Sequence, residues 1–442
     1  MMTGRCRAVT AAVALATAMP VVAADKELLD ILLANGAIDQ AQYEKLLKKE
    51  EIEKSDVDEV IATLDRKGLN VKTSDGDYTF KIGTRLHAEA STHKGDLPEG
   101  NEPNNGTELR RARIEAKGTI AKNWNWVAEV DFADDRTSVK DFWLGYKTEG
   151  GTKLMFGHQK QPYSLDIEMS SNDIAFVERS VDNFLLVPFA DRAIGFRAER
   201  SGSNWYAAGG FFGDSAGPLA DAQNEGRGAV GRFVYSPIVD DDQILHLGVR
   251  ALGRDPADGA RFVRLRDETT HLSGLRIVDT GVILGVDRSV VSGLEAAYAA
   301  GPLSFMGEYH DLEIERNNAD DLNFSGWHLI GRWAITGESY ADAYKMSSGE
   351  FKRLTPRQDF DRDAGTWGAW EFALRYANLD LNDGDILGGE EDVVSTALNW
   401  YPNSNMRFMF EWTRIVDTDE SSPLREAAVG LNIFQVRTQY TF

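Results

Sequence analysis

The sequence predicts an all-β protein, a transmembrane antiparallel β-barrel of about 16 strands that follows a short N-terminal helical segment. From residue 77 to residue 442, hydrophobic and polar side chains alternate with a period of two. The chain ends on such a strand, "IFQVRTQYTF", with Phe442 last. No stretch of the mature chain approaches the roughly 18 apolar residues of a transmembrane helix. An apolar content of 42 % still suits a barrel, because only every second barrel residue faces lipid.

Residues 1–24 are typical of a secretory signal peptide. A basic start, "MMTGRCR", precedes the short apolar stretch "AVTAAVALATAM", and Val22 and Ala24 are the small residues before an expected cut at Asp25. Cys6, the one cysteine, lies in this segment. We therefore expect a mature protein without disulfides or thiol chemistry.

Residues 25–76 predict a periplasmic helical hairpin or coiled segment. Asn35–Gly36 separates two helical patterns, and Asp39 with Gln42 forms the capping-box pair of the second. We expect a third helix around Val57–Leu64. The segment is either an assembly or anchoring module or a poorly packed leader. The apolar stripe of the first helix consists of Leu28, Leu29, Leu32 and Leu33.

Residues 77–442 predict the barrel itself. In "LRRARIEAKGTI", Ala112 and Ile114 share one face, whereas Arg111 and Arg113 share the other. The same pattern recurs in "GAWEFALRYANL" and "NMRFMFEWTRIV". The segment is long enough for roughly sixteen strands of about ten residues with turns and loops. A soluble sandwich or solenoid also alternates, but it does not explain charged residues opposite aromatic faces on strand after strand.

These strands resemble the phosphate-selective porin family, porins O and P. The matching pieces are "LRRARIEAKGTIAKNW", "KDFWLGYK", "LMFGHQKQPYSLD", "FVERS", "DRAIGFR", "TGESY", "FKRLTP", "GAWEFALRYANLDLNDGD" and "LNWYPNSNMRFMFEW". The resemblance implies a sixteen-stranded, trimeric outer-membrane barrel that passes small anions. It also implies a third loop that folds inward to narrow the pore, expected here at about 161–190.

A track of basic side chains along the inner wall is the candidate anion pathway. Arginine suits this role because its charge is fixed and its planar fork matches phosphate oxygens. A row of such sites lets an ion pass from one to the next. The alternation assigns to the wall Arg111, Arg113, Lys117, Arg197, Arg250, Arg332, Arg375, Arg407 and Arg437, and Lys160, Arg179 and Arg192 lie near the expected constriction.

Acidic residues allow another interpretation of this track. Each arginine could be a solvated wall residue paired with Glu115, Glu129, Asp141, Glu199, Glu371 or Glu411. The expected constriction loop is itself acidic, with Asp166, Glu168, Asp173, Glu178 and Asp182. Acids facing arginines give a transverse field that orders water, which does not by itself select anions and weighs against strict phosphate preference.

One motif resembles the active-site sequence of an enzyme. "GDSAGP", from Gly213 to Pro218, fits the pattern of a nucleophile elbow, but that elbow needs a helix after the serine. Pro218 and "LADAQNEGRG" indicate a loop instead, so we assign Ser215 no catalytic role. The seven histidines form no metal-spaced pair. We therefore predict no catalytic residue, no metal and no cofactor.

The predicted function is passive, anion-preferring diffusion of small solutes across an outer membrane, with phosphate or polyphosphate as the solute. A general-diffusion porin without phosphate specificity and a surface β-protein whose barrel is only an anchor remain alternatives. Expected partners are small anions, outer-membrane lipid, two further copies in a homotrimer and the barrel-assembly machinery through Phe442. A net charge of -22 disfavours nucleic acid as a partner.

Overall fold

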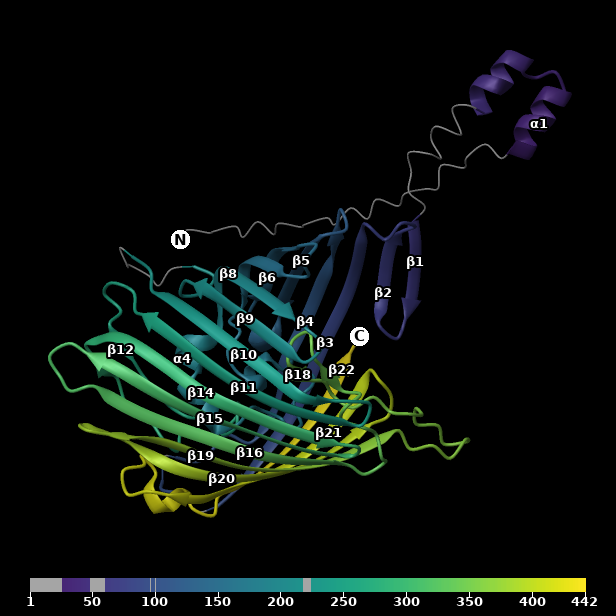
Figure 1. Ribbon diagram of the computed structural model, residues 1–442. Helices are drawn as coiled ribbons and strands as arrows, with labels where there is room; N and C mark the ends of the chain where they lie inside the picture. Colours follow the sequence, from purple (N-terminus) through teal and green to yellow (C-terminus); the bar gives the residue numbers. More distant parts are fainter. Residues whose placement is uncertain (1–25, 48–59, 96, 100, 218–223) are drawn as a thin grey trace, which may run out of the picture. The chain divides into compact units, whose positions relative to one another are not determined.

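Sixteen antiparallel strands among the described residues close into a barrel, which confirms the predicted fold class. The computed structural model describes residues 26–47, 60–95, 97–99, 101–217 and 224–442. Each strand pairs with its neighbour, and β22 pairs with β3 to close the ring (Figure 1). No helix in these ranges is long and apolar enough to cross a membrane.

The barrel strands run from β3 to β22 in chain order. They are β3 (Thr79–Lys94), β4 (Gly106–Ile120), β5 (Trp124–Asp131), β6 (Ser138–Lys147), β7 (Lys153–Lys160), β8 (Arg192–Ser201), β9 (Trp205–Phe212), β10 (Arg227–Val239), β11 (Gln243–Asp255), β14 (Val286–Ala300), β15 (Leu303–Arg316), β16 (Leu322–Ala334), β19 (Ala369–Asp383), β20 (Ile386–Tyr401), β21 (Met406–Thr418) and β22 (Asn432–Thr441). Two 3-10 turns, η1 (Ala133–Asp135) and η3 (Arg425–Ala428), lie in their connections.

The strands bury their polar side chains and expose their apolar ones. On β22, Phe434 and Val436 are exposed, whereas Gln435 and Arg437 are buried. This inversion is expected of a barrel in lipid, where hydrocarbon covers the outside and polar groups line the interior. The terminal Phe442 lies beside β3, with its backbone N–H and C=O paired to Thr84.

The N-terminal segment contains both a predicted and an unpredicted element. Helix α1 (Lys26–Ala34) and a second helix over 40–47 form, and the capping box joins the backbone N–H of Gln42 to Asp39 and that of Asp39 to Gln42. The third helix expected around Val57–Leu64 is wrong. Strand β1 (Val60–Asp65) forms there, because its β-branched residues pair with β2 (Gly68–Thr73), which in turn pairs with β3. Residues 1–25, which include the expected signal peptide, lie outside the described residues.

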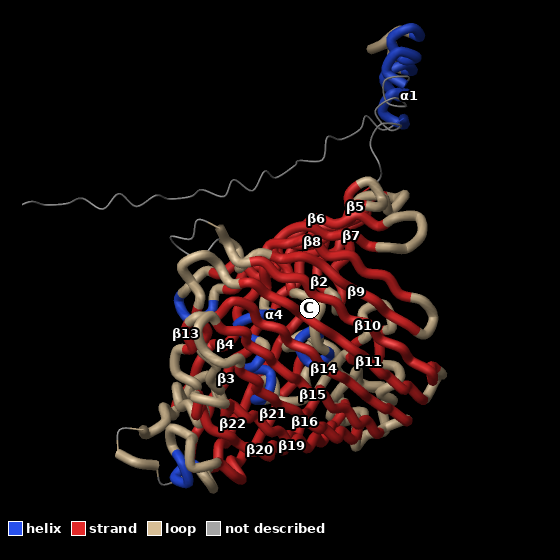
Figure 2. The backbone as a smooth tube through the Cα atoms, turned by 60° about the vertical axis from the view of Figure 1, so that its left-hand side comes forward, coloured by secondary structure: helices blue, strands red, loops and turns tan. Residues whose placement is uncertain are grey.

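The first of three long connections has helices within the barrel (Figure 2), and it packs against the other two through apolar clusters. The inward loop, residues 161–191, contains α3 (Leu165–Glu168), η2 (Val181–Leu185) and α4 (Val187–Ala190). The second insert, residues 256–285, contains β12 (Phe262–Val263) and β13 (Ile283–Leu284), and the third insert, residues 335–368, contains β17 (Tyr344–Lys345) and β18 (Glu350–Phe351). Leu185 of the inward loop and Ile277 of the second insert belong to one apolar cluster. Phe176 of the inward loop and Phe351 of the third insert belong to another.

Candidate functional site

The inward loop is held by carboxylates of the barrel wall. Glu295 accepts the backbone N–H of Leu165 at 2.9 Å, and Glu308 accepts that of Asp166 at 2.7 Å. Glu411 accepts the N–H of Val177 at 2.5 Å. A loop with little helix or sheet of its own leaves many backbone groups unpaired, and a buried unpaired group is costly. The wall carboxylates therefore supply the hydrogen-bond acceptors that backbone carbonyls provide in a helix or a sheet.

Wall arginines satisfy the carbonyl groups of the same loop. Arg407 donates to the carbonyl of Ile174 at 2.7 Å, and Arg375 donates to that of Glu178 at 3.0 Å. Both guanidiniums are buried. These predicted pathway residues are thus engaged with the loop backbone.

Three arginines surround the carboxylate of Glu178, at the centre of the loop. Arg110 and Arg111 approach it to 3.0 and 3.2 Å, and Arg437 approaches it to 2.9 Å. Burial raises the pKa of Glu178, but the three guanidiniums outweigh burial and hold that pKa well below its usual value. Glu178 therefore stays ionised and neutralises part of the positive charge of the wall arginines.

A β-bulge explains why two consecutive arginines reach Glu178. In the β3–β4 register Arg111 stands opposite His87 and Leu109 opposite Ala88, so Arg110 has no partner on β3. An extra residue of this kind turns its side chain out of strict alternation. Simple alternation would place Arg110 outside the barrel, which is why the sequence pattern missed it.

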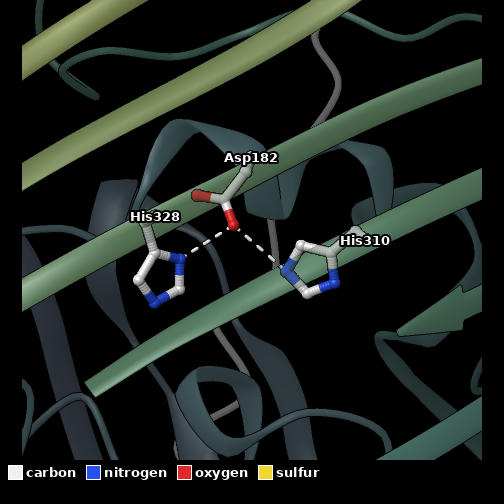
Figure 3. Close-up of side chains that lie close together, drawn as sticks. All are labelled: Asp182, His310 and His328. Atoms are coloured by element: carbon white, nitrogen blue, oxygen red, sulfur yellow. Dashed lines mark hydrogen bonds and ion pairs between the residues drawn. The ribbon is translucent and has the colours of Figure 1, made fainter. Parts of the chain in front are cut away.

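Asp182 fastens the loop to β15 and β16 (Figure 3). Its Oδ2 lies 2.8 Å from Nδ1 of His328 and 3.1 Å from Nε2 of His310. Arg250 donates to Nδ1 of His310 at 2.8 Å, so the hydrogen of that imidazole is on Nε2, facing Asp182. The three side chains are close enough to hold a metal ion. The proton on Nε2 and the adjacent guanidinium instead favour a hydrogen-bonded latch.

The third insert packs against the inward loop and the wall. The guanidinium of Arg332 lies 4.4 Å from the ring centre of Tyr340 and 5.1 Å from that of Phe351. Lys352 reaches Asp173 of the inward loop at 3.4 Å. Two inward segments therefore meet inside the barrel and narrow its interior.

Water-accessible space remains in three chambers that charged side chains help to line. The loop-end chamber has about 280 Å³ and is lined by Arg110, Arg111, Glu178 and His271. The two terminus-end chambers have about 400 and 490 Å³, and the smaller of them touches Phe442. Lys160 lines all three chambers. The space inside the barrel therefore converges on one lysine.

Carbonyl oxygens hold the ammonium of Lys160. Its Nζ donates to the carbonyls of Ile167 at 2.7 Å and of Glu168 and Met169 at 3.2 Å. Arg179 donates to the carbonyl of Met169 at 2.7 Å. Among the described residues, neither cation has a carboxylate within ion-pair distance. Backbone carbonyls are therefore the direct partners of both side chains.

The other predicted pathway residues divide into two groups. Arg192, which pairs with Asp141 at 2.9 Å, lines two chambers. Arg197, bound to Glu168 at 2.8 Å, lines the largest. The chambers are also lined by Arg111, Arg113, Lys117 and Arg179. The residues that do not line these three chambers are Arg250, Arg332, Arg375, Arg407 and Arg437.

The structure adds basic residues to the chamber walls that sequence reasoning missed. These are Arg85, Arg110, Lys147, Lys153, Arg200, Lys345, Lys352 and Arg353. Lys352 and Arg353 belong to "FKRLTP" in the third insert. The length of that connection was the available signal, because barrel connections at the end that carries the C-terminus are usually short turns.

Ser215, the serine of the enzyme-like motif, lies in a loop. Residues 214–217 form a bend, and residues 218–223 are outside the described ranges. The carbonyl of Ser215 accepts the backbone N–H of Ile194 at 3.2 Å.

Comparison with known proteins identifies the family. A family model for phosphate-selective porin O and P matches residues 80–442. The chain belongs to the phosphate-selective porin O and P family. It is an outer-membrane porin, and its family and fold are those of a channel rather than an enzyme.

Relatives agree with this assignment. An uncharacterized protein of Caulobacter vibrioides is 30 % identical over 368 residues, covering 79 % of this chain and 71 % of that one. Porin O of Pseudomonas aeruginosa is 26 % identical over 419 residues, covering 85 % and 91 %. Among solved structures, an anion-selective porin from Comamonas acidovorans has a TM-score of 0.53 at 10 % identity, covering 83 % of this chain and all of that one. OmpT of Vibrio cholerae has a TM-score of 0.53 at 13 % identity, covering 83 % and 98 %. These distant structures share the barrel fold.

Proposed function

We propose that this porin passes phosphate-like anions, and that Lys160 is the site they share between the two ends of the barrel. The supporting observation is that Lys160 stands where the chambers meet, that Arg179 lines the loop-end chamber, and that both are held by carbonyls, not by carboxylates. An incoming anion can replace part of its hydration there without displacing a paired acid. Phosphate is the family's solute and fits this chemistry.

The charges of the residues that line the chambers also favour the passage of anions. The whole chain carries -22, yet the described residues lining the loop-end chamber include five Lys or Arg against three Asp or Glu. The largest chamber has six against five. The third has seven against six, and the terminal carboxylate of Phe442 balances that excess. The pathway is therefore most positive at the loop end, which we assign to the exterior.

Planar-bilayer recording tests the role of Lys160. In a KCl gradient the wild-type reversal potential should show anion preference. Lys160→Gln should lower the anion-to-cation permeability ratio at least about fivefold, since a unit charge at 4 Å is worth about 1–4 kcal/mol in partly solvated surroundings. Lys122→Gln, in an exposed turn, is the matched control and should leave the ratio unchanged. An unchanged ratio in Lys160→Gln would refute the assignment.

Competition between phosphate and chloride distinguishes the proposed anion-preferring porin from a general-diffusion porin and from a barrel that is only an anchor. Inorganic phosphate added to chloride solution should reduce the single-channel chloride current, because both ions use the same cations. A general-diffusion porin would show no such reduction. A barrel that is only an anchor would give no channels at all.

The proposal also covers the oligomeric state of the protein, its insertion into the membrane and the location of its N-terminal segment. OmpT of Vibrio cholerae is described in a trimer form, which supports a homotrimer here. The exposed aromatic ring of Phe442 suits capture of the last strand by the barrel-assembly machinery, and the apolar outer face suits membrane lipid. We place residues 25–76 in the periplasm after removal of residues 1–24, and we assign the protein no catalytic residue or cofactor.

A further inference from the structure

The outer face of the barrel carries a groove of about 660 Å³ across β9, β10, β11 and β14. The strand register places Phe211, Ala229, Gly253 and Val290 in one row across these strands. The next row toward the terminus end is smaller still, with Gly209, Gly231, Ala251 and Ser292. The small residues in the middle of these two rows thus leave a depression beside the larger side chains of Phe211 and Val290.

Gly253 lines the groove and Gly231 lies in the next row below it, and the backbone at these two glycines forms an open floor. A Cβ atom built on Gly231 or on Gly253 would meet no atom within 4 Å. Phe211, which is 71 % exposed, stands at one side of the groove, and Phe233 stands below it. Nothing in the described chain fills this space, so a chain of hydrocarbon can lie against the backbone there.

Two arginines stand at the upper edge of the groove. Arg227 and Arg288 both donate from Nε to Asp255, at 3.3 and 2.9 Å. In the part of the chain that the structure describes, these are the hydrogen bonds that the two guanidiniums make. Their side chains are 84 % and 51 % exposed. One carboxylate therefore orients two guanidiniums whose remaining N–H groups are available to an anion.

Below the groove the outer face stays concave and apolar. A second depression of about 1130 Å³ begins at Phe233 and Leu294 and continues past Ala296 and Gly307. Cationic donors therefore lie above a long apolar channel, at the loop end of the barrel. This arrangement matches an amphiphile with an anionic head and hydrocarbon tails.

We propose that this groove binds a lipid with a phosphorylated headgroup from the outer leaflet of the outer membrane. The headgroup phosphate pairs with Arg227 and Arg288, and an acyl chain lies on the floor at Gly231 and Gly253. Glu225 also lines the groove, so recognition depends on the placement of donors rather than on net charge. The site lies outside the pore and does not depend on the proposed anion path.

Native mass spectrometry of the detergent-solubilised protein tests the proposal, with bis-phosphorylated lipid A as the probe. The wild type should retain one lipid, and dephosphorylated lipid A should bind at least about tenfold more weakly, a loss of about 1.4 kcal/mol. The double variant Arg227→Gln/Arg288→Gln should lose phosphorylated lipid A to the same extent. Gly231→Val/Gly253→Val should lose both lipids, because the new side chains fill the floor.

The control is Arg414→Gln, which removes an exposed arginine of β21 and should bind lipid A as the wild type does. Every variant should keep its heat-modifiable gel mobility and its single-channel conductance, since none of these residues lines a chamber. Lipid A that stays bound in both double variants would overturn the proposal. Dissociation of an oligomer in the glycine variant without loss of lipid would identify the groove as a contact between copies, which also overturns it.

Discussion

The two halves of the inner wall carry the same residue types and use them differently. Along β14–β21, charged side chains such as Glu295, Arg375 and Arg407 are buried and bind the inward loop. Along β4–β8, Lys117, Lys160 and neighbouring cations line the chambers instead. The first half mainly holds the constriction in place, whereas cations of the second half also line the chambers where the solute would pass.

This difference shows that an inward-facing charge has no fixed role until its opposite surface is known. A guanidinium beneath the loop must be paired, since an uncompensated buried charge costs several kcal/mol. A cation that faces a chamber keeps water and can attract an anion. The surface opposite therefore decides between a structural and a transporting role.

We expect the largest effect on stability from removal of the Glu295 carboxylate, which lies in the half of the wall that holds the inward loop. This carboxylate is fully buried and pairs with Arg232 at 2.7 Å and with Arg250 at 3.0 Å. Glu295→Ala removes one carboxylate partner from each of these two guanidiniums and the acceptor of the N–H of Leu165. We expect a loss of about 3–5 kcal/mol in the free energy of unfolding, measured by urea titration in lipid vesicles.

The matched control for Glu295 comes from the chamber half. Glu115 pairs with Lys117, whose side chain is 48 % exposed. Glu115→Ala should cost at most about 1 kcal/mol, because a solvated ion pair contributes little to stability. Equal losses in the two variants would show that the two halves of the wall do not differ.

A smaller effect is expected at the latch. Asp182→Asn keeps the shape of the side chain but removes the charge shared by His310 and His328. We expect a stability loss of about 1–3 kcal/mol and larger current fluctuations, because the loop is freer to move. The measurements are thermal loss of the compact gel form and single-channel noise.

A chelator serves as the control for the latch. If EDTA destabilised the wild type as much as the substitution does, the cluster would be a metal site rather than a set of hydrogen bonds. Asp385→Asn, at an exposed carboxylate paired with Arg316, should change neither stability nor noise.

The barrel and the inward direction of its charges followed from the sequence because period-two alternation is a local signal. The capping box at Asp39 and Gln42 is local in the same way, and it formed as predicted. The helix expected around Val57–Leu64 failed, because pairing of β1 with β2 outweighed a weak helical pattern.

The division of roles among the arginines was beyond the sequence. Arg113 and Arg407 are both directed into the barrel by alternation, and only the folded inward loop distinguishes their roles. The bulge at Arg110 and the third insert with Lys352 are likewise set by tertiary contacts. His310 and His328 lie far from Asp182 in the chain, so sequence spacing could not place the three together.

The smallest effect should come from pH at the loop-end chamber. His271 lies in the second insert, and its hydrogen bond to Glu108, at 2.7 Å, raises its pKa above the usual value. The imidazolium therefore persists to a higher pH than that of an unperturbed histidine, and it is lost as pH rises through that raised pKa. Anion preference should fall over this window by about twofold or less, as a partly solvated charge is worth under about 1 kcal/mol. Reversal potentials at pH 6 and pH 9 measure the change, and His271→Gln should reduce it. A variant that kept the full pH response would place the titrating group elsewhere on the chamber wall.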